Sequence, residues 1–234
     1  MAALTDLIAE PGRAALFLDI DGVLAPIVDR PGDARVPEET RVELRRLAGR
    51  YALVACVTGR PSDVARELVA VPELLYAGEH GMELDPEAAA WAARIHAFAD
   101  RGPGDVERKP LSVAYHFRSA ADPDAARAAL AGIAQAAVAE GFRARWGRMV
   151  LEVLPPVDTS KGTAVRVLLE ERGLRRALYA GDDTTDLDGF AALDGLEVAV
   201  RVAVASAESP PELSARADVV LSSTGDVLQF LRGL

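Results

Sequence analysis

The chain has 234 residues, of which half are hydrophobic, and its 26 basic and 36 acidic side chains give a net charge of −10. This length suits one large domain or two small ones with a sizeable core. The acidic balance argues against nucleic acid or an anionic membrane as a partner, since both are negatively charged.

The first ten residues, MAALTDLIAE, lack a basic segment and carry Asp6 and Glu10. Later apolar runs are shorter than the roughly 20 residues that cross a bilayer. We therefore expect a cytoplasmic protein with no membrane segment. Cys56 is the one cysteine, which excludes an internal disulfide and a multi-cysteine metal site, and its apolar surroundings predict a buried core residue.

Short apolar segments recur along the chain, each followed by loop residues and then by a helical pattern. They are AALFLDIDG (14–22), YALVACVTGR (51–60), LLYAGEHG (74–81), RALYAGDDTTD (176–186), LEVAVRVA (196–203) and DVVLSS (218–223). Amphipathic stretches at 37–50, 61–71 and 161–173 predict crossover helices. This alternation is typical of an α/β protein with a mostly parallel sheet.

The middle of the chain has a different pattern. LSVAYHFRS (111–119) alternates apolar and polar residues, which predicts a half-buried antiparallel strand. An alanine-rich helix is expected at 123–141, and a second strand, RMVLEVLP (148–155), places Glu152 on one face with Val150 and Leu154. We expect an α+β insertion at 83–156 within a parallel-sheet core formed by 1–82 and 157–234.

Polar side chains follow several of the predicted parallel strands. Such strands end at one edge of a sheet, where ligands bind, so these side chains should converge. They are Asp19 and Asp21 after the first strand, Thr58, Gly59 and Arg60 after the second, Asp182, Asp183 and Asp186 after a later one, and Lys161 at the start of a helix.

Several carboxylates at one edge require a cation, because neighbouring like charges raise one another's pKa. Oxygen ligands without a Cys or His cluster favour Mg²⁺. A calcium loop is the competing interpretation of DIDG and DLDG. It fails because the twelfth loop position would be Val28 or Gly195 rather than Glu.

A bound Mg²⁺, a lysine, a hydroxyl group and a helix N-terminus together suit phosphoryl transfer. The sequence offers no Ser or Cys nucleophile motif. We expect Asp19 to attack phosphorus and form an aspartyl-phosphate. Asp21, two residues on, would protonate the leaving alkoxide and then deprotonate water.

These residues resemble the four signatures of the haloacid dehalogenase-like phosphatases: DIDGVL at 19–24, Thr58, Lys161 and GDDTTD at 181–186. The resemblance implies a Rossmann-like core with an inserted α+β cap domain of the C2 type. It also implies Mg²⁺ held by Asp19, the Asp21 carbonyl and Asp182, with Asp183 or Asp186 in support. The phosphate contacts that it implies are Thr58 and Lys161, and we expect Gly59 and Arg60, which follow the same strand as Thr58, to bind phosphate as well.

Within that superfamily the chain is similar to the trehalose-6-phosphate phosphatases over nearly its whole length, in GEHG (78–81), ERKPLSVAYHFR (107–118), LEVLPPVDTSKG (151–162) and GDDTTD. Leu187 and Phe117 depart from that family's common acidic residue and tyrosine. The resemblance implies hydrolysis of trehalose 6-phosphate, the last step of trehalose biosynthesis, a functional link to a trehalose-6-phosphate synthase, and a lid over the site. The substrate contacts implied are Glu79, His80, Glu107, Lys109, His116, Arg118 and Glu152.

Several alternatives stay open at this point. Arg60 could pair with an acidic neighbour instead of phosphate, His80 could be a turn residue, and His116 with Arg118 could form a solvated sheet face. The substrate could be another sugar or glycosyl phosphate, such as sucrose phosphate or glucosylglycerol phosphate, and the scaffold could serve a phosphosugar mutase. A non-catalytic module that binds a phosphosugar is the remaining alternative.

Overall fold

The computed structural model describes residues 2–28, 30–100, 106–147, 149–207 and 209–234. The chain divides into two compact units. One, the core unit, comprises Met1–Gly81 and Thr159–Leu234, and the other, the inserted unit, comprises Met82–Asp158. Within the described ranges, every helix is too short or too polar to pass through a lipid bilayer.

The core unit contains a six-stranded parallel sheet in the order β10-β9-β8-β1-β2-β3. Its strands are β1 (Ala15–Leu18), β2 (Leu53–Val57), β3 (Leu75–Ala77), β8 (Arg176–Gly181), β9 (Val198–Val204) and β10 (Val219–Leu221). The chain adds β2 and β3 on one side of β1, then returns to place β8 on the other side. Strand order therefore reverses between β1 and β8, which is where ligands bind in open α/β sheets.

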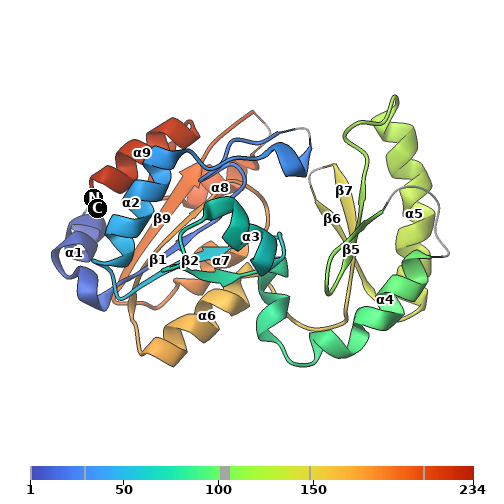
Figure 1. Cartoon of the computed structure of the whole chain (residues 1–234), viewed down its shortest axis with the longest axis horizontal. Coiled ribbons are helices and arrows are strands. Elements are labelled where there is room, and N and C mark those ends of the chain that lie inside the picture. The colour runs from blue at the N-terminus through green and yellow to red at the C-terminus, as the bar shows by residue number, and fades with distance from the viewer. Residues whose placement is uncertain (1, 29, 101–105, 148, 208) are drawn as a thin grey trace. The chain divides into compact units, whose positions relative to one another are not determined.

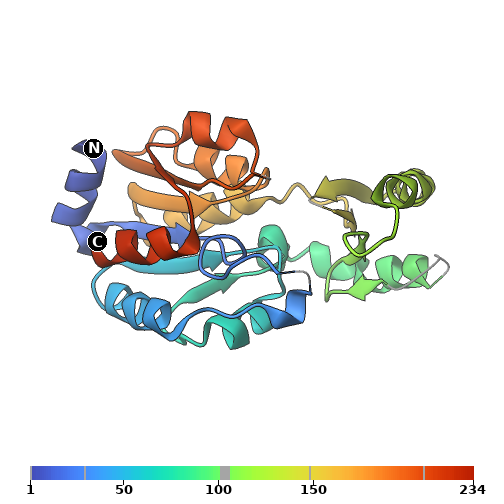
Figure 2. The same cartoon turned by 90° about the horizontal axis from the view of Figure 1, so that it is seen from above.

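Helices cover both faces of this sheet, so the core unit has three layers (Figures 1 and 2). Leu16 and Leu18 pack beneath α1 (Ala2–Ala9), α2 (Glu38–Ala48), α3 (Ser62–Val69) and α9 (Thr224–Arg232). Ala15 and Phe17 pack beneath α6 (Lys161–Arg172), α7 (Asp186–Ala192) and α8 (Pro211–Arg216). A strand buried on both faces must be apolar at every position, which is why β1 reads ALFL.

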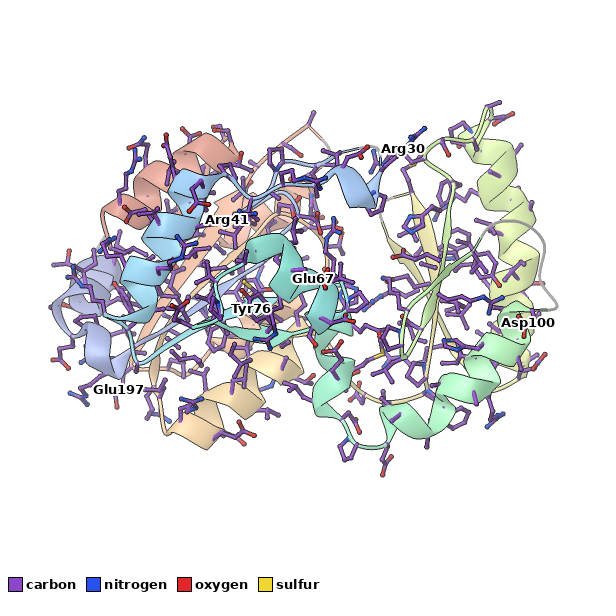
Figure 3. The ribbon with its side chains drawn as sticks, in the orientation of Figure 1. Arg30, Arg41, Glu67, Tyr76, Asp100 and Glu197 are labelled. Carbon is purple, nitrogen blue, oxygen red and sulfur yellow. The ribbon has the colours of Figure 1, made fainter. Side chains whose placement is uncertain are left out.

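On the first of these faces, one polar contact joins two helices and another joins β3 to the loop before it. Arg41 on α2 donates to the carbonyl of Leu68 in α3 at 3.1 Å (Figure 3). Tyr76 of β3 donates to the carbonyl of Val71 at 2.8 Å. The two chain ends lie at the same end of the core unit (Figures 1 and 2).

The inserted unit is a four-stranded antiparallel sheet with two helices packed on one face (Figure 1). The strands, in the order β4-β5-β7-β6, are β4 (Glu107–Arg108), β5 (Val113–His116), β7 (Val150–Leu154) and β6 (Arg143–Gly147). Alternate residues such as Val113 and Leu151 bury against α4 (Ala92–Ala99) and α5 (Pro123–Ala139). The other face carries Glu107, Ala114, Glu152 and Arg145, which are aligned across the four strands.

The predicted fold class, a parallel-sheet α/β core with an α+β insertion, is confirmed. All six predicted core strands are present, as are the helices at 38–48, 62–69, 123–139 and 161–172. Pro37 and Pro61, with which two of the predicted helical stretches begin, are the N-cap residues just before their helices. The sequence did not reveal β4 and β6, and Arg148, the first residue of the predicted second strand, lies outside the described residues.

Candidate active site

Asp19 occupies the point where β1 ends, beside β8. Its backbone N–H donates to the carbonyl of Ala180 at 2.9 Å, which extends the pairing of β1 with β8 by one residue. One carboxylate oxygen accepts from the N–H of Ile20 at 2.7 Å and the other from Lys161 Nζ at 2.7 Å. The carboxylate is thus held at both oxygens, and it is only 5% exposed.

Lys161 is the first residue of α6 and lies buried between two carboxylates. Ser160 caps the helix, because its side chain accepts from the N–H of Thr163, while the hydroxyl oxygen of Thr163 accepts from the N–H of Ser160. Lys161 Nζ then lies 2.7 Å from Asp19 Oδ2 and 2.7 Å from Asp186 Oδ1. Helix capping therefore fixes the position from which the ammonium group reaches the end of β1.

Asp186, at the start of α7, accepts four hydrogen bonds. Its Oδ1 accepts from Lys161 and from the Tyr179 hydroxyl, both at 2.7 Å. Its Oδ2 accepts from the backbone N–H groups of Asp182 and Asp183, both at 2.9 Å. A carboxylate offers about four lone-pair sites. All four sites of Asp186 are therefore occupied, and Asp186 holds Lys161 and the turn that carries Asp182 in place.

Asp182 directly follows β8 and is 4% exposed. Its carboxylate lies against the backbone of Gly22, so closely that a Cβ at residue 22 would overlap it. Gly22 also has φ of +82°, a conformation that residues with a side chain rarely adopt. The glycine after DID is therefore required both by the turn and by the approach of Asp182.

Burial and neighbouring charges together set the protonation of these groups. Burial raises the pKa of Asp19 to about 7, although Lys161 opposes the rise. Burial alone would lower the pKa of Lys161, but the carboxylates of Asp186 and Asp19 raise it above its ordinary value, so the lysine stays charged. Burial also holds the pKa of Tyr179 well above its usual range, which keeps its hydroxyl a donor to Asp186.

Asp19, Asp182 and Asp186 each offer a carboxylate oxygen, and these oxygens lie within 4.8 Å of one another. With Lys161 included, the group carries a net charge of −2 when all four side chains are ionised. A divalent cation would balance that charge, and oxygen ligands are those that Mg²⁺ prefers. The donor set thus fits Mg²⁺, and Asp19 and Asp182 are the candidate ligands because Asp186 already accepts four hydrogen bonds.

The remaining predicted residues of the core unit lie on neighbouring loops. Asp21 accepts a bidentate ion pair from Arg60, with Nε to Oδ2 and Nη2 to Oδ1 both at 2.7 Å. Thr58 follows β2, and its Oγ1 accepts from the N–H of Arg60 at 3.2 Å. Asp183 accepts from the N–H of Thr184 at 2.7 Å.

The GEHG loop after β3 is bound to the loop after β2. The backbone N–H of Glu79 donates to the carbonyl of Arg60 at 2.9 Å, and that of His80 to the carbonyl of Thr58 at 2.8 Å. Glu79 and His80 have φ of 45° and 59°, so both are in the left-handed region that side chains disfavour. The imidazole of His80 lies close against Gly59. The predicted substrate role of these two residues stays a prediction.

Four of the five predicted substrate contacts in the inserted unit form two close polar pairs, one an ion pair and the other a hydrogen bond. Lys109 Nζ lies 2.9 Å from Glu152 Oε1, and both side chains are less than a tenth exposed. His116 Nε2 lies 2.6 Å from Glu107 Oε2, and this hydrogen bond holds the pKa of Glu107 below its ordinary value. Arg118, the fifth, lies in the turn after β5.

Two polar residues of these clusters were not predicted from the sequence. Arg145 on β6 donates to Glu152 Oε2 from Nε at 3.1 Å and from Nη2 at 2.7 Å. The alternation of Arg143, Ala144, Arg145 and Trp146 was the available signal for this strand. The signal for Tyr179 was a hydroxyl inside an otherwise apolar strand, since a buried tyrosine usually has a polar partner.

Comparisons with known proteins show which family the chain resembles. A family model described as Trehalose-phosphatase matches residues 17–103 and 93–221. A trehalose-phosphate phosphatase of Mycobacterium ulcerans is 34% identical over 212 residues, covering 81% of this chain and 54% of that protein. An uncharacterized glycosyl hydrolase of Mycobacterium tuberculosis is also 34% identical, over 81% of this chain but only 16% of its own length. The chain therefore spans a small part to about half of these relatives.

Solved structures show the same fold. The C-terminal domain of Candida albicans trehalose-6-phosphate phosphatase superposes with a TM-score of 0.77, at 22% identity, over 100% of this chain and 96% of that one. An Aspergillus fumigatus trehalose-6-phosphate phosphatase gives a TM-score of 0.64 at 25% identity, over 99% of this chain and 96% of that one. Because the family model spans most of the sequence and a relative shares a third of its residues, the chain belongs to the trehalose-phosphatase family.

Proposed function

We propose that this protein is a Mg²⁺-dependent phosphatase that converts trehalose 6-phosphate to trehalose and inorganic phosphate. The observation that carries the proposal is the buried contact of Lys161 with Asp19 and Asp186, beside Asp182, at the point of strand reversal. A buried carboxylate that directly follows the end of a strand and is held at both oxygens suits nucleophilic attack. Family membership supplies the substrate class.

In this proposal Asp19 is the nucleophile. The bonds from Ile20 and Lys161 hold the carboxylate in one orientation, which reduces the entropy lost on reaching the transition state. One Asp19 oxygen bonds to phosphorus while the bond from phosphorus to the sugar oxygen breaks, and that oxygen takes a proton from Asp21. Asp21 then takes a proton from the water that attacks the aspartyl-phosphate, which releases phosphate and restores both carboxyl groups.

Mg²⁺ would be held by Asp19 and Asp182, with the Asp21 carbonyl implied by the resemblance. When bound, it would neutralise the carboxylates and draw charge from the transferring phosphoryl group. Lys161 would add a fixed positive charge for the phosphate oxygens, and the Thr58 hydroxyl a donor. Asp186 would hold Lys161 in place rather than bind the ion.

Substrate choice is assigned to the polar face of the inserted sheet. Lys109 and Glu152 are buried and hydrogen-bonded to each other, and Glu107 and His116 lie in the same sheet. Paired charges of this kind offer donors and acceptors to the many hydroxyls of a disaccharide. A cytoplasmic location and a functional link to a trehalose-6-phosphate synthase stay predictions.

The test is phosphate release from trehalose 6-phosphate, glucose 6-phosphate, sucrose 6-phosphate and glucosylglycerol phosphate, with Mg²⁺ or EDTA. Wild type is compared with Asp19→Asn and with Asp6→Asn, a matched change at an exposed aspartate. We expect trehalose 6-phosphate to be preferred, and EDTA or Asp19→Asn to abolish turnover. Preference for another ester would refute the substrate, full activity of Asp19→Asn would refute the nucleophile, and binding without turnover would favour a non-catalytic module.

A further inference from the structure

The carboxylate of Glu152 lies between two cationic side chains on the polar face of the inserted sheet. Lys109 Nζ donates to its Oε1 at 2.9 Å, and Arg145 donates to its Oε2 from Nε at 3.1 Å and from Nη2 at 2.7 Å. The side chains of Lys109 and Glu152 are only 9% and 8% exposed, and that of Arg145 is 26% exposed. Both oxygens of Glu152 accept from positive groups, which is the arrangement of an ionised carboxylate.

The register of the inserted sheet places Arg145 beside Glu152. Arg145 on β6 is paired with Glu152 on β7, so the two side chains are direct neighbours on one face of the sheet (Figure 1). Trp146, the next residue of β6, points to the other face and packs against the hydrophobic core there. The strand pairing itself therefore brings the guanidinium to the Glu152 carboxylate.

Arg145 restricts the motion of Glu152. The last torsion of a glutamate side chain is broad, so a carboxylate turns easily about that bond unless both of its oxygens are held. Without Arg145, Oε2 loses the two bonds from the guanidinium and the carboxylate can turn. Lys109 is a flexible side chain, so its ammonium group would move with the oxygen that it contacts. Loss of Arg145 therefore changes the orientation of both partners.

We infer that Arg145 is a positioning residue that sets selectivity for the sugar by acting through Glu152, and this rests on the proposed function. In that function Glu152 and Lys109 offer an acceptor and a donor to hydroxyl groups of the substrate. A hydrogen bond to a hydroxyl depends on direction as well as on distance, so an acceptor that turns freely binds it less well. Arg145 holds Glu152, and with it Lys109, in one orientation, and it takes no part in phosphoryl transfer.

Two esters separate this role from a general structural one. Trehalose 6-phosphate carries the sugar, whereas p-nitrophenyl phosphate has the same phosphoryl group and no sugar hydroxyl. Loss of a residue that positions sugar contacts therefore affects the first ester and spares the second. A variant that is merely unfolded in part loses kcat on both esters and keeps both KM values.

The experiment measures kcat and KM for both esters, and the inhibition of p-nitrophenyl phosphate hydrolysis by trehalose, which reports sugar binding alone. The variants are Arg145→Met, Glu152→Gln and the double variant that combines them. Methionine keeps part of the apolar stem of arginine, and Arg145→Gln is the second variant if Arg145→Met does not fold. Arg127→Ala is the matched control, since the Arg127 guanidinium lies 4.4 Å from the ring centroid of Trp146, on the opposite face of β6. Circular dichroism confirms that each variant is folded.

We expect Arg145→Met to raise about tenfold both the KM for trehalose 6-phosphate and the inhibition constant of trehalose, the effect of one misplaced hydrogen bond. The kcat for trehalose 6-phosphate, and both constants for p-nitrophenyl phosphate, should stay close to wild type. In the double variant, Arg145→Met should add no further loss to that of Glu152→Gln, because Arg145 acts through Glu152. Arg127→Ala should resemble wild type.

Unchanged sugar constants for Arg145→Met would overturn the inference, as would equal losses on both esters. A further loss in the double variant would overturn it by showing that Arg145 contacts the sugar directly. Full activity of Glu152→Gln on the sugar ester would overturn it as well, because no sugar contact would then be left to position. The proposed function fails separately, if wild type does not prefer trehalose 6-phosphate. The comparison then uses whichever sugar phosphate is hydrolysed, with its free sugar as the inhibitor, and wild type that hydrolyses none refutes both.

Discussion

Lys161→Met removes the ammonium group that lies 2.7 Å from both Asp19 and Asp186. Lys161 is 2% exposed, so water cannot readily replace it. Removing one partner of a buried ion pair typically costs about 3–5 kcal/mol, because a charge is left buried and uncompensated. We expect a loss of that size in the free energy of unfolding above pH 8, without Mg²⁺.

The loss should depend on pH, and its sign follows from Asp19. The pKa of Asp19 is about 7 in the folded protein against an ordinary 3.8, so the folded state holds a proton that the unfolded chain has released. This contribution to stability is complete below pH 3.8 and is lost as the pH rises through 7. The difference between these two pKa values corresponds to about 4 kcal/mol in the free energy of unfolding. Without Lys161 the decline should extend to higher pH, so the variant should resemble wild type most closely in acid.

Urea unfolding at pH 5.5 and 8.5, with and without Mg²⁺, measures how the stability loss of Lys161→Met depends on pH. Trp91 and Trp146, the two tryptophans of the chain, both belong to the inserted unit, so fluorescence follows that unit while circular dichroism follows the whole chain. Lys161→Met should shift the circular dichroism transition. Lys109→Met is the matched control, since Lys109 pairs with Glu152 in the inserted unit, and it should shift fluorescence. Wild-type stability of Lys161→Met at pH 8.5 would refute the reasoning.

Three further changes test other contacts. Asp186→Asn places an amide donor against existing donors and should lower the free energy of unfolding by about 2–3 kcal/mol in thermal unfolding. Asp188→Asn, at an exposed position, should leave stability unchanged. Equal stability of the two variants would show that the four hydrogen bonds to Asp186 do not stabilise the fold. Gly22→Ala should weaken Mg²⁺ binding at least tenfold by calorimetry, because the added methyl group would displace the Asp182 carboxylate. Gly12→Ala is the control, since a methyl group there meets open space. Unchanged Mg²⁺ affinity of Gly22→Ala would contradict the close approach of Asp182 to Gly22. Lys109→Met should lower kcat/KM about tenfold or more for the sugar phosphate and little for p-nitrophenyl phosphate, while parallel losses would place it outside the sugar contacts.

The sequence predicted those parts of the fold whose burial leaves a simple pattern. Strands buried on both faces are continuous apolar runs, so β1 and β8 were predicted correctly. The missed strand β4 has two residues, Glu107 and Arg108, both exposed, and carries too short a signal. The missed strand β6 is only partly buried, so the alternation of Arg143 and Arg145 with Ala144 and Trp146 is a weak signal for a strand.

The site was predictable as a set of convergent residues but not as a set of contacts. Parallel strand ends predicted that Asp19, Lys161 and Asp186 would meet. Sequence could not show that Asp186 is already saturated by four donors, because two are backbone groups and one is a tyrosine outside the motif. Nor could it show that Arg60 faces Asp21, since that depends on how two loops pack.

The two kinds of basic residue have distinct positions in this chain. Lysine occurs only at 109 and 161 among the 26 basic residues, and both are buried against carboxylates. An ammonium group is compact enough to lie between two carboxylates from different elements, as Lys161 does, whereas a guanidinium is wider and planar. Where a single side chain contacts both oxygens of one carboxylate, as at Asp21, that side chain is an arginine. The geometry of each contact, rather than charge alone, thus accounts for which cation is present.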